Sequence, residues 1–464
     1  MRNLEIMSLV ARVFTRAFYR DLEEYEMPIE LTNFTLCLLW AASICAVLAA
    51  RPICAQQINP GPWRAESQRA DIAPKSWREQ QIQFQGESTL ALAGDGKDFA
   101  NGCWTRTVEI DPNVSLEFIT YFKSNQVEES YRSVLARIIW QDQHGKQIER
   151  AEYPATAPTP TPGGWSVIRQ VYQSPAEVRK ARLELVYRWD ADGTVYFGGT
   201  SLKPIQAQKA RLVRLASVHH RPRHSQSSQE NLEQFAALVD QAGQRGADIV
   251  CLPEGVTVVG TGKSYVSVSE PIPGPSTAFL GEVAARNGLY IVAGLYERDG
   301  QAVYNTAVLI DRHGAFVGKY RKVCLPREEI DGGITPGDVF PTFKTDFGRI
   351  GMMICWDVAF PEPARALAMG GAEVILMPIW GGNLTLTQAR AIENQVYLVS
   401  STYNMKSAVF DQEGTILAEG TLEEPVVIVE VDLNQQKLWP WLGDLKNRIR
   451  REMPPRRAIS ADKQ

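Results

Sequence analysis

The sequence predicts an α/β layered fold that is preceded by an antiparallel all-β region. Between Gln81 and Leu202, apolar side chains recur at every second position, which is typical of strands with one buried face. After Lys203, short apolar strands alternate with amphipathic helices, and this alternation favours layers of helix and sheet. A chain of 464 residues is long enough for two or three such domains.

The first 55 residues contain a candidate export signal. Residues 34–50 read FTLCLLWAASICAVLAA, an uncharged apolar run, and Arg12, Arg16 and Arg20 lie on its N-terminal side. Positive charge before an apolar run favours a cytoplasmic N-terminus, so residues 1–55 are predicted to hold a signal peptide or a membrane anchor. The rest of the chain would then be exported (secreted or periplasmic) or tethered to a membrane. The alternative is a buried core helix.

Residues 81–205 are predicted to form a β-sandwich, after a polar linker at residues 56–80. The stretch SLEFITYFK places Leu116, Phe118 and Phe122 on one face of a strand, and ARLELVYRW alternates in the same way. Turn sequences such as DQHGK and DADGT separate these runs. Short alternating strands with this punctuation are typical of antiparallel sandwiches.

Residues 210–432 are predicted to form the α/β domain, and residues 433–464 a basic, aromatic extension. The run SQENLEQFAALVDQAGQ has apolar residues at helical spacing and begins with Ser228, a suitable N-cap. Further helices are expected at STAFLGEVAARNG, PEPARALAMGG and LTQARAIENQ, and strands at DIVCLPE, LYIVAGLYE, RIGMMIC and AEVILMP. AVYNTAVLID and AFVGKYRKV read as a hairpin.

Composition excludes several classes of function. The net charge is −4, so the chain lacks the basic excess of nucleic-acid-binding proteins. The sequence has no phosphate-loop glycine pattern and no zinc-ribbon cysteine pairing, and we expect no cofactor and no metal. After residue 55, Cys103, Cys251, Cys324 and Cys355 are far apart and do not look like a disulfide framework.

Three residues stand where predicted strands end and loops converge: Glu254, Lys322 and Cys355. Each alone has an ordinary explanation, as a turn cap, a solvated cation or a core cysteine like Cys251. Together they make chemical sense, because a nearby ammonium lowers the pKa of a thiol and a carboxylate can take its proton. When a thiolate attacks a C=O or C≡N carbon, a fixed lysine also stabilises the charge that grows on the heteroatom.

The motifs around these positions resemble those of the carbon–nitrogen hydrolase (nitrilase) superfamily. LPEG, YNTAVLIDRHGAFVGKYRKVCLP, TPGD, ICWDVAFPEPARALAMGGAEVILMP and RAIENQVYLV occur in the family's order and with similar spacing, over about residues 210–432. The resemblance implies a four-layer α-β-β-α sandwich that is often paired into a homo-oligomer. It implies that Cys355 is the nucleophile, Glu254 the general base and Lys322 the transition-state stabiliser.

The resemblance also assigns supporting positions. The family's additional glutamate, in the loop after the lysine, corresponds to Glu329 or to its neighbour Glu328. The backbone N–H of Trp356 would complete the site for the oxyanion. Arg390 and Glu393 in RAIEN match motif positions and are expected to form a structural ion pair.

Two features near the motifs depart from a simple match. Cys324 stands where the family commonly has histidine, which leaves local packing and substrate positioning open without affecting the triad. The segment VHHRPRH contains His219, His220 and His224, but no carboxylate lies close in sequence. We interpret these histidines as loop residues near the pocket mouth, and the competing interpretation is a metal site.

The residues after the cysteine favour one reaction class. CWDVAFPEPAR is more similar to the N-carbamoyl amine and aliphatic amide branches than to the nitrilase branch, which tends to have glutamate after Cys–Trp. We therefore predict hydrolysis of a small amide or N-carbamoyl amine through a cysteine thioester. The alternatives are nitrile hydrolysis or N-acyl transfer by the same residues, or a glycan-binding protein with an inactive hydrolase domain.

The predicted β-sandwich resembles, more weakly, the jelly-roll carbohydrate-binding-like modules of secreted enzymes. Its aromatic residues Trp140, Trp165, Trp189 and Tyr196 could stack on a glycan. The competing interpretation is that most of them belong to the core of the sandwich.

Overall fold

The computed structural model describes residues 61–148, 153–154, 159–435, 437–439 and 443–453. The predicted export segment at residues 34–50 lies outside these ranges. Among the described residues, no helix combines the length and the apolar composition needed to cross a lipid bilayer.

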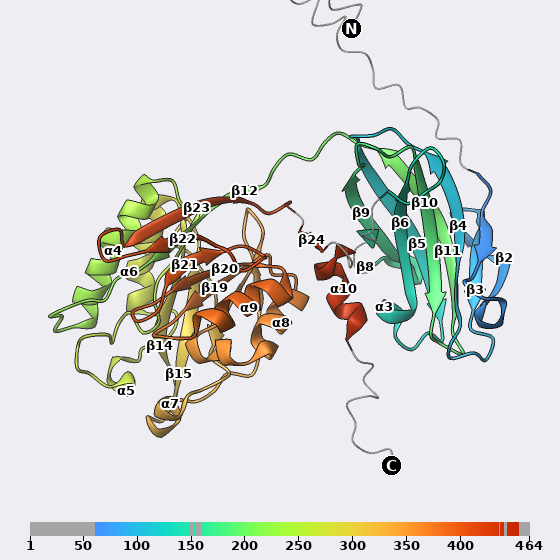
Figure 1. Ribbon diagram of the computed structural model, residues 1–464. Helices are drawn as coiled ribbons and strands as arrows, with labels where there is room; N and C mark the ends of the chain where they lie inside the picture. The colour runs from blue at the N-terminus through green and yellow to red at the C-terminus, as the bar shows by residue number, and fades with distance from the viewer. Residues whose placement is uncertain (1–60, 149–152, 155–158, 436, 440–442, 454–464) are drawn as a thin grey trace, which may run out of the picture. The chain divides into compact units, whose positions relative to one another are not determined.

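The β region, residues 61–204, consists of two antiparallel sheets (Figure 1). The strands of one sheet, in spatial order, are β1 (Arg64–Glu66), β4 (Asn101–Glu109), β10 (Lys180–Arg188), β6 (Val134–Gln141) and β7 (Tyr153–Pro154). Those of the other are β2 (Lys75–Phe84), β3 (Glu87–Ala93), β11 (Thr194–Pro204), β5 (Ser115–Asn125), β9 (Ser166–Gln173) and β8 (Thr159–Pro160). Phe118 of β5 and Leu183 of β10 are buried in one hydrophobic cluster, so the two sheets share a core.

The strands begin earlier than the sequence predicts. β1 lies within residues 56–80, the predicted linker, and β2 begins there at Lys75; they pair with β4 and β3 respectively. Both are edge strands, and most of their residues are exposed. A strand that buries little surface has no clear alternation of apolar and polar residues. Its sequence is therefore hard to distinguish from that of a polar linker. The linker prediction is wrong for these two strands.

The α/β region, residues 212–432, contains two six-stranded sheets. The strands of the first, in spatial order, are β16 (Phe316–Arg321), β15 (Ala302–Ile310), β14 (Tyr290–Asp299), β13 (Ile249–Cys251), β12 (Leu212–Val218) and β23 (Val426–Asp432). Those of the second are β17 (Thr342–Lys344), β18 (Arg349–Met352), β19 (Val374–Pro378), β20 (Tyr397–Ser401), β21 (Ser407–Phe410) and β22 (Ile416–Gly420). In each sheet three parallel strands are followed by antiparallel hairpins.

Helices cover the outer faces of both sheets (Figure 1). They are α4 (Ser228–Gln244) and α6 (Pro275–Asn287) on the first sheet, and α8 (Pro361–Met369) and α9 (Leu384–Asn394) on the second. Phe235 of α4 packs in the cluster beneath the first pair, and Leu367 of α8 in that beneath the second. A third cluster, which includes Leu215 and Ile350, fills the space between the sheets. The predicted α-β-β-α arrangement is therefore confirmed for this region.

Shorter elements complete the described chain. They are η1 (Ala70–Ile72), α3 (Ser130–Ser133), η2 (Pro162–Gly164), α5 (Tyr265–Val268), α7 (Arg327–Asp331), η3 (Cys355–Ala359), β24 (Leu438–Trp439), β25 (Gly443–Asp444) and α10 (Leu445–Glu452). The last three lie in the predicted C-terminal extension.

The N-cap of helix α4 lies one residue earlier than the sequence predicts. Its N-cap is Ser227, whose hydroxyl oxygen accepts a hydrogen bond from the backbone N–H of Glu230. The hydroxyl of Ser228 instead donates to the carbonyl oxygen of Thr257, at 2.8 Å. Two adjacent serines are equivalent as capping signals, and a tertiary contact decides between them.

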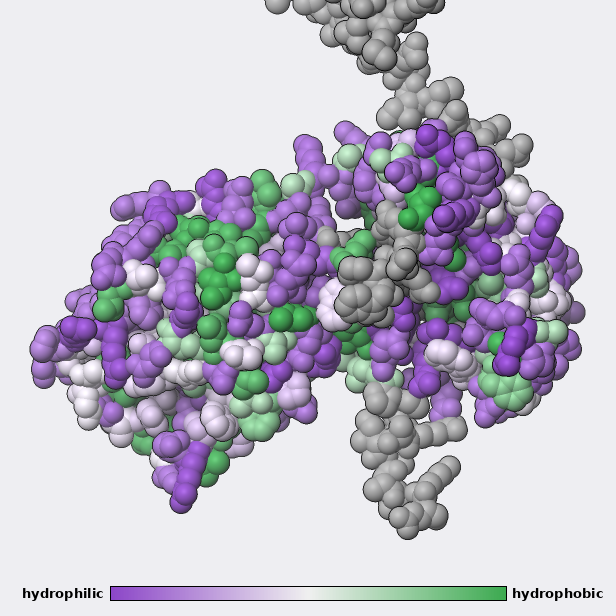
Figure 2. Space-filling view, viewed as in Figure 1, coloured by the Kyte–Doolittle hydropathy of each residue, from purple (hydrophilic) through white to green (hydrophobic). Residues whose placement is uncertain are grey.

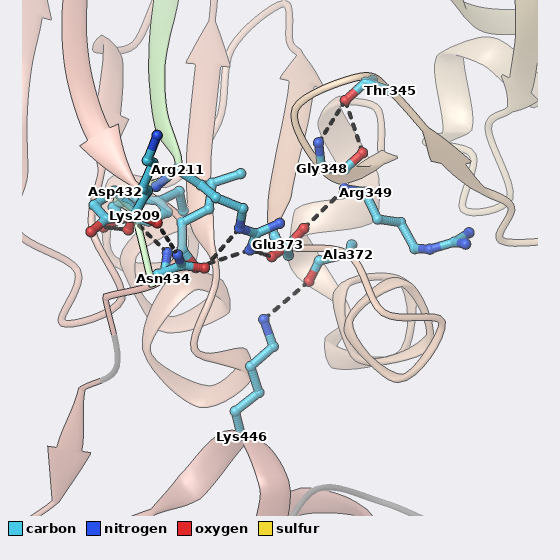
Figure 3. Close-up of polar contacts among 12 residues, drawn as sticks. Lys209, Arg211, Thr345, Gly348, Arg349, Ala372, Glu373, Asp432, Asn434 and Lys446 are labelled. Carbon is cyan, nitrogen blue, oxygen red and sulfur yellow. Dashed lines mark hydrogen bonds and ion pairs between the residues drawn. The ribbon is translucent and has the colours of Figure 1, made fainter. Parts of the chain in front are cut away.

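A polar network joins the two sheets at the N-terminal ends of their parallel strands (Figure 3). Arg211, beside the start of β12, donates to the carboxylate of Glu373 and, through Nε, to Oδ1 of Asn434 at 2.7 Å. Glu373 also accepts from the backbone N–H of Arg349, at the start of β18, at 3.0 Å. Functional sites of parallel sheets lie at the opposite, C-terminal strand ends, so this network is structural.

The face of the α/β region seen in Figure 2 is mainly hydrophilic. Hydrophobic side chains gather in one area of that face, over the strands β20 to β22. Leu417 on β22 and Leu422 just after it are exposed. A few exposed apolar side chains are normal on a protein surface, and these carry no functional conclusion.

Candidate active site

The three residues that the sequence singles out lie just beyond strand ends. Glu254 follows the last residue of β13 by three positions, and Lys322 directly follows β16. β18 ends at Met352, and Cys355 begins the 3₁₀ turn η3. The sequence predicts strands that run up to Glu254 and Cys355, whereas both strands stop earlier. Cys355 has a left-handed φ of 43°, which lies outside the extended region of backbone conformation.

Lys322 is the centre of a buried charged cluster. Its Nζ lies 2.9 Å from Oε1 of Glu254 and 3.0 Å from Oε2 of Glu329. Nδ2 of Asn305, on β15, donates to Oε1 of Glu254 at 2.6 Å and to Oε1 of Glu329 at 2.5 Å. All four side chains are buried. Charged groups are tolerated at this depth only with such partners, so the contacts fix the geometry of the cluster.

Asn305 is a residue of this cluster that sequence reasoning missed. It lies in AVYNTAVLID, where the apolar residues around it indicate a buried strand. A single amide inside such a strand is itself a signal, because a buried amide needs hydrogen-bond partners. Asn305 finds them in the two carboxylates that flank the lysine.

The structure separates the two candidates for the additional glutamate. Both lie on the short helix α7, where Glu329 is buried against Lys322 and Glu328 is exposed. Successive helical residues point about 100° apart, so only one of the pair can face the cluster. Glu329 is the one that does.

The protonation of the cluster follows from its burial and its charges. Burial by itself would lower the pKa of Lys322, but the neighbouring Glu254, Cys355 and Glu329 raise that pKa above its ordinary value. Lys322 therefore stays cationic. Burial raises the pKa of Glu329, and the ammonium of Lys322 opposes this rise.

The thiol of Cys355 is neutral in the free site. Burial raises its pKa to about 12, the charge of Glu254 adds to the rise, and Lys322 opposes it. Lys322 does lower this pKa, as the sequence predicts of a nearby ammonium, but burial and Glu254 outweigh its contribution. The sulfur lies 3.5 Å from the carbonyl oxygen of Gly381. Attack by this thiol therefore requires that its proton be removed as the substrate reacts.

Asp357 connects the turn that holds Cys355 to the strand end that holds the lysine. Its Oδ2 accepts from the backbone N–H of Ile354 at 2.8 Å and from the hydroxyl of Tyr320 at 2.7 Å. Its Oδ1 accepts from the backbone N–H of Cys324 at 3.0 Å. Ile354 directly precedes the cysteine, and the other two donors flank the lysine. One buried carboxylate thus fixes both segments.

The hydrogen bond from Cys324 to Asp357 does not depend on having cysteine at this position, where the family commonly has histidine. The donor to Asp357 is the backbone N–H of Cys324, which any residue except proline supplies. Burial, followed by the negative charge of Asp357, raises the pKa of the Cys324 thiol to about 12. Cys324 is therefore a neutral thiol, as Cys355 is in the free site.

A cavity of about 430 Å³ opens beside the cluster. Trp380 and Tyr265 line it. Trp380 directly precedes Gly381, which contacts the sulfur of Cys355, and Tyr265 stacks on Tyr296 with ring centroids 4.5 Å apart. The charges of Glu329 and Glu254 reach Tyr265, where burial and then these carboxylates raise the tyrosine pKa. The cavity is therefore a neighbour of the candidate site through Trp380 and Tyr265.

The backbone N–H of Trp356, the residue that the resemblance assigns to the oxyanion, directly follows Cys355 in η3. Its indole ring is about half exposed and lies edge-on to Phe360. Arg390 and Glu393 form the expected ion pair, at 2.9 Å, and Arg390 also donates to the carbonyl oxygen of Val358. The contact with Val358 anchors the η3 turn, which begins at Cys355, to helix α9.

The histidines of the loop after β12 have ordinary partners. His219 bonds to Ser407 at 3.0 Å and His220 to Gln234 at 3.1 Å, while His224 is exposed. In the part of the chain that the structure describes, no group of three or more His, Cys, Asp or Glu side chains could hold a metal ion.

The four aromatic residues proposed for sugar stacking have different environments. Trp140 is fully buried in the core of the β region and cannot stack on a ligand. Trp165 and Tyr196 are partly exposed, and Trp189 is exposed with the guanidinium of Arg188 lying 3.9 Å from its ring centroid.

The four layers, with the cysteine turn beside the buried cluster of Glu254 and Lys322 at the strand ends, make up an α/β domain with a candidate active site. Comparisons with known proteins agree. Residues 214–440 match the carbon–nitrogen hydrolase family. A nitrilase of Pyrococcus abyssi is 36% identical over 247 residues, which cover 48% of this chain and 90% of that protein. The omega-amidase NIT2 of Homo sapiens is 32% identical, with 44% and 84% covered.

Among solved structures, an amidase from Nesterenkonia sp. matches at 25% identity with a TM-score of 0.43, covering 49% of this chain and 92% of that one. Nit3 of Saccharomyces cerevisiae matches at 26% identity and a TM-score of 0.43, with 48% and 90% covered. The chain belongs to the carbon–nitrogen hydrolase family. It is a hydrolase that acts on carbon–nitrogen bonds other than peptide bonds.

Proposed function

We propose that the enzyme hydrolyses a small amide or N-carbamoyl amine through a thioester on Cys355. The observation that carries this proposal is the buried cluster in which Lys322 bridges Glu254 and Glu329 beside the cysteine turn. In this arrangement the roles are general base for Glu254, charge stabiliser for Lys322 and nucleophile for Cys355. The names of the relatives, which include amidases, support the amide class.

In the first half-reaction, the sulfur of Cys355 forms a bond to the substrate carbonyl carbon while Glu254 takes the thiol proton. The negative charge that develops on the carbonyl oxygen is stabilised by Lys322 and by the backbone N–H of Trp356. The carbon–nitrogen bond then breaks, and Glu254 returns the proton to the departing nitrogen. The product is ammonia or an amine, and the acyl group remains on sulfur as a thioester.

In the second half-reaction, water attacks the thioester. The oxygen of the water bonds to the acyl carbon while Glu254 takes a proton from the water. The carbon–sulfur bond breaks, and the thiolate recovers the proton from Glu254. The acid leaves, and the site returns to its neutral-thiol state, which is the state that the raised pKa of Cys355 favours.

Glu329 and Asn305 are proposed to hold the reacting groups in place. Oε1 of Glu329 accepts hydrogen bonds from both Lys322 and Asn305, and Glu329 and Asn305 are both buried. Without Glu329, the lysine would lose one of its two anionic partners. The ammonium would then be free to move away from the position where the substrate oxygen becomes charged.

The neighbouring glutamates on α7 allow a matched test. Glu329→Gln is expected to lower kcat by about a hundredfold, because an amide holds Lys322 more weakly than a carboxylate. Glu328→Gln, on the exposed side of the same helix, is expected to keep wild-type activity within about twofold. Steady-state ammonia release measures both variants. Equal loss in the two would remove Glu329 from the proposed site.

Alkylation by iodoacetamide tests the protonation state of the nucleophile. Cys355 is expected to react faster than Cys251, which is fully buried in the core. Because the pKa of Cys355 is raised to about 12, its thiolate fraction rises about tenfold per pH unit across roughly pH 7 to 9. Peptide mapping should therefore show a rate that climbs steeply without a plateau. A rate that is constant over this range would mean that the free site already holds a thiolate.

Nitrile hydrolysis is the second candidate, because one of the similar proteins is named a nitrilase. The residue after Cys–Trp favours amides over nitriles, since Asp357 stands where the nitrilase branch tends to have glutamate. Turnover of matched amides and nitriles decides between them: faster acid formation from the nitrile would favour the second candidate.

We also propose that residues 81–205 form a β-sandwich module of the jelly-roll type that binds a glycan, and that residues 1–55 export or tether the enzyme. The two antiparallel sheets of the β region and the partly exposed Trp165 and Tyr196 support the first idea. The apolar run at residues 34–50 supports the second. Glycan-array binding and cell fractionation test them; no glycan bound, or enzyme only in the cytosol, would contradict them. A homo-oligomer is also proposed, from the family resemblance alone.

A further inference from the structure

We propose that the hydroxyl of Tyr403 sets the position of the general base Glu254 relative to Cys355. Tyr403 is a positioning residue in this account, because it acts through the main chain of Glu254. This inference rests on the roles of Glu254 and Cys355 in the proposed function and adds a residue to that site.

The base and the nucleophile come from different sheets. Glu254 follows β13 of the first sheet, whereas Cys355 follows β18 of the second. The distance between the carboxylate and the sulfur therefore depends on contacts that join the two sheets at these strand ends. Proton transfer needs hydrogen-bond distance, so a small slip between the sheets would lower the rate.

Tyr403 supplies one such contact at the base. It follows β20 of the second sheet by two residues, and its hydroxyl donates a hydrogen bond to the main-chain carbonyl oxygen of Glu254 at 2.9 Å. Tyr403 is buried, and burial followed by the charge of Glu254 raises the pKa of its phenol well above the ordinary value. The hydroxyl therefore keeps its proton and remains a donor. A buried carbonyl that loses its donor is costly, so this bond holds the residue in place.

The same tyrosine contacts the segment beside the cysteine. Its backbone N–H donates to the carbonyl oxygen of Trp380 at 3.3 Å, and the two rings pack edge-on with centroids 5.1 Å apart. The next residue, Gly381, places its carbonyl oxygen 3.5 Å from the sulfur of Cys355. Tyr403 thus contacts the base through its hydroxyl and the cysteine side through its backbone and its ring.

An arginine from the first sheet restricts the movement of this tyrosine. The guanidinium of Arg221, in the loop after β12, lies 6.0 Å from the ring centroid of Tyr403 and 5.9 Å from that of Trp380. It also donates to Oδ1 of Asn404, the residue after Tyr403, at 3.1 Å. Because β12 belongs to the first sheet, Arg221 forms a second link between the sheets at the same place.

The test removes the hydroxyl and keeps the ring. Tyr403→Phe in the full-length enzyme is expected to lower kcat for butyramide about tenfold and to leave KM within about twofold, because the base is misplaced while binding is not. Tyr397→Phe is the matched control, since it removes a hydroxyl at the other end of β20 that donates to the carbonyl oxygen of Asp432 at 3.4 Å. This control should keep wild-type kcat within about twofold.

Alkylation of Cys355 shows whether Tyr403 acts through Glu254. Burial and the charge of Glu254 raise the pKa of this thiol, so a carboxylate that is held less closely should leave a larger thiolate fraction. Tyr403→Phe is therefore expected to speed alkylation by iodoacetamide about threefold at about pH 8. In a Glu254→Gln background the charge is absent, and adding Tyr403→Phe should leave the rate unchanged. A merely structural loosening would speed alkylation equally in both backgrounds.

Alkylation needs no substrate, so it separates the inference from the proposed function. If the wild type hydrolyses butyramide and Tyr403→Phe leaves both kcat and the alkylation rate unchanged, the inference is wrong and the proposed function stands. Equal acceleration with and without the Glu254 carboxylate, or a loss of kcat that Tyr397→Phe shares, would also overturn the inference. If no amide or carbamoyl compound is hydrolysed while the acceleration still depends on Glu254, the proposed function fails and the positioning of Glu254 by Tyr403 stands.

Discussion

Cys355→Ala is expected to lower amide hydrolysis by about four orders of magnitude or more, because the reaction proceeds through a bond to this sulfur. Cys355 begins the η3 turn, next to the carbonyl oxygen of Gly381 and within the influence of Glu254 and Lys322. No other cysteine of the α/β region stands in this position: Cys251 is core, and the backbone of Cys324 is bound to Asp357. Ammonia release under substrate saturation measures the loss.

The matched control is Cys251→Ala. This residue is fully buried in the cluster between the two sheets, so its truncation is expected to cost about 1 kcal/mol of stability and little of kcat. A thermal melt and a rate measured well below the melting temperature separate the two effects. If Cys355→Ala retained most of its activity while remaining folded, the assignment of the nucleophile would be wrong.

Asp357→Asn is expected to lower kcat by about a hundredfold with little change in KM. The asparagine keeps the shape of Asp357 but turns one acceptor oxygen into a donor, which faces donors from Ile354, Tyr320 or Cys324. The cysteine turn and the lysine strand end would then separate, and a displacement of about 1 Å between reacting groups costs about two orders of magnitude in rate. Asp357 acts in this account as a positioning residue.

A purely structural role for Asp357 would give a different pattern. Tyr320→Phe removes one of the three donors and is expected to produce a smaller loss, of about tenfold, in the same direction. Both variants should also slow the alkylation of Cys355, because the turn that presents the sulfur is loosened. If Asp357→Asn lowered the melting temperature but left kcat and the alkylation rate unchanged at low temperature, the positioning role would be contradicted.

The sequence predicts the layers of the α/β region well because its strands and helices have strong, distinct periodicities. LYIVAGLYE and PEPARALAMGG each form the predicted element. The strands β1 and β2 escaped prediction for the opposite reason: as edge strands with little buried surface, they have no apolar pattern to detect. An element can be predicted from the sequence when one of its faces is buried, because burial requires apolar residues at regular spacing.

At the candidate site, the residue types were predictable and their electrostatics were not. Glu254 and Lys322 do meet, with Glu329 as the second acid. Spacing alone could not choose between Glu329 and Glu328, because that choice depends on which side of a short helix faces inward. Nor could it predict the neutral thiol of Cys355, since the pKa of this thiol depends on its depth of burial and on its distances to Glu254 and Lys322. Asn305 and Asp357 act through tertiary contacts that join distant segments.

The most direct test of the central claim is to trap the acyl group on the enzyme. A single-turnover reaction with succinamate or butyramide is quenched in acid, and the cysteine peptides are analysed by mass spectrometry, with hydroxylamine present in a parallel reaction. A thioester on Cys355, and a hydroxamate formed at the expense of the free acid, are the predicted results. Ammonia release at the full rate with no adduct on Cys355 and no hydroxamate would contradict the account.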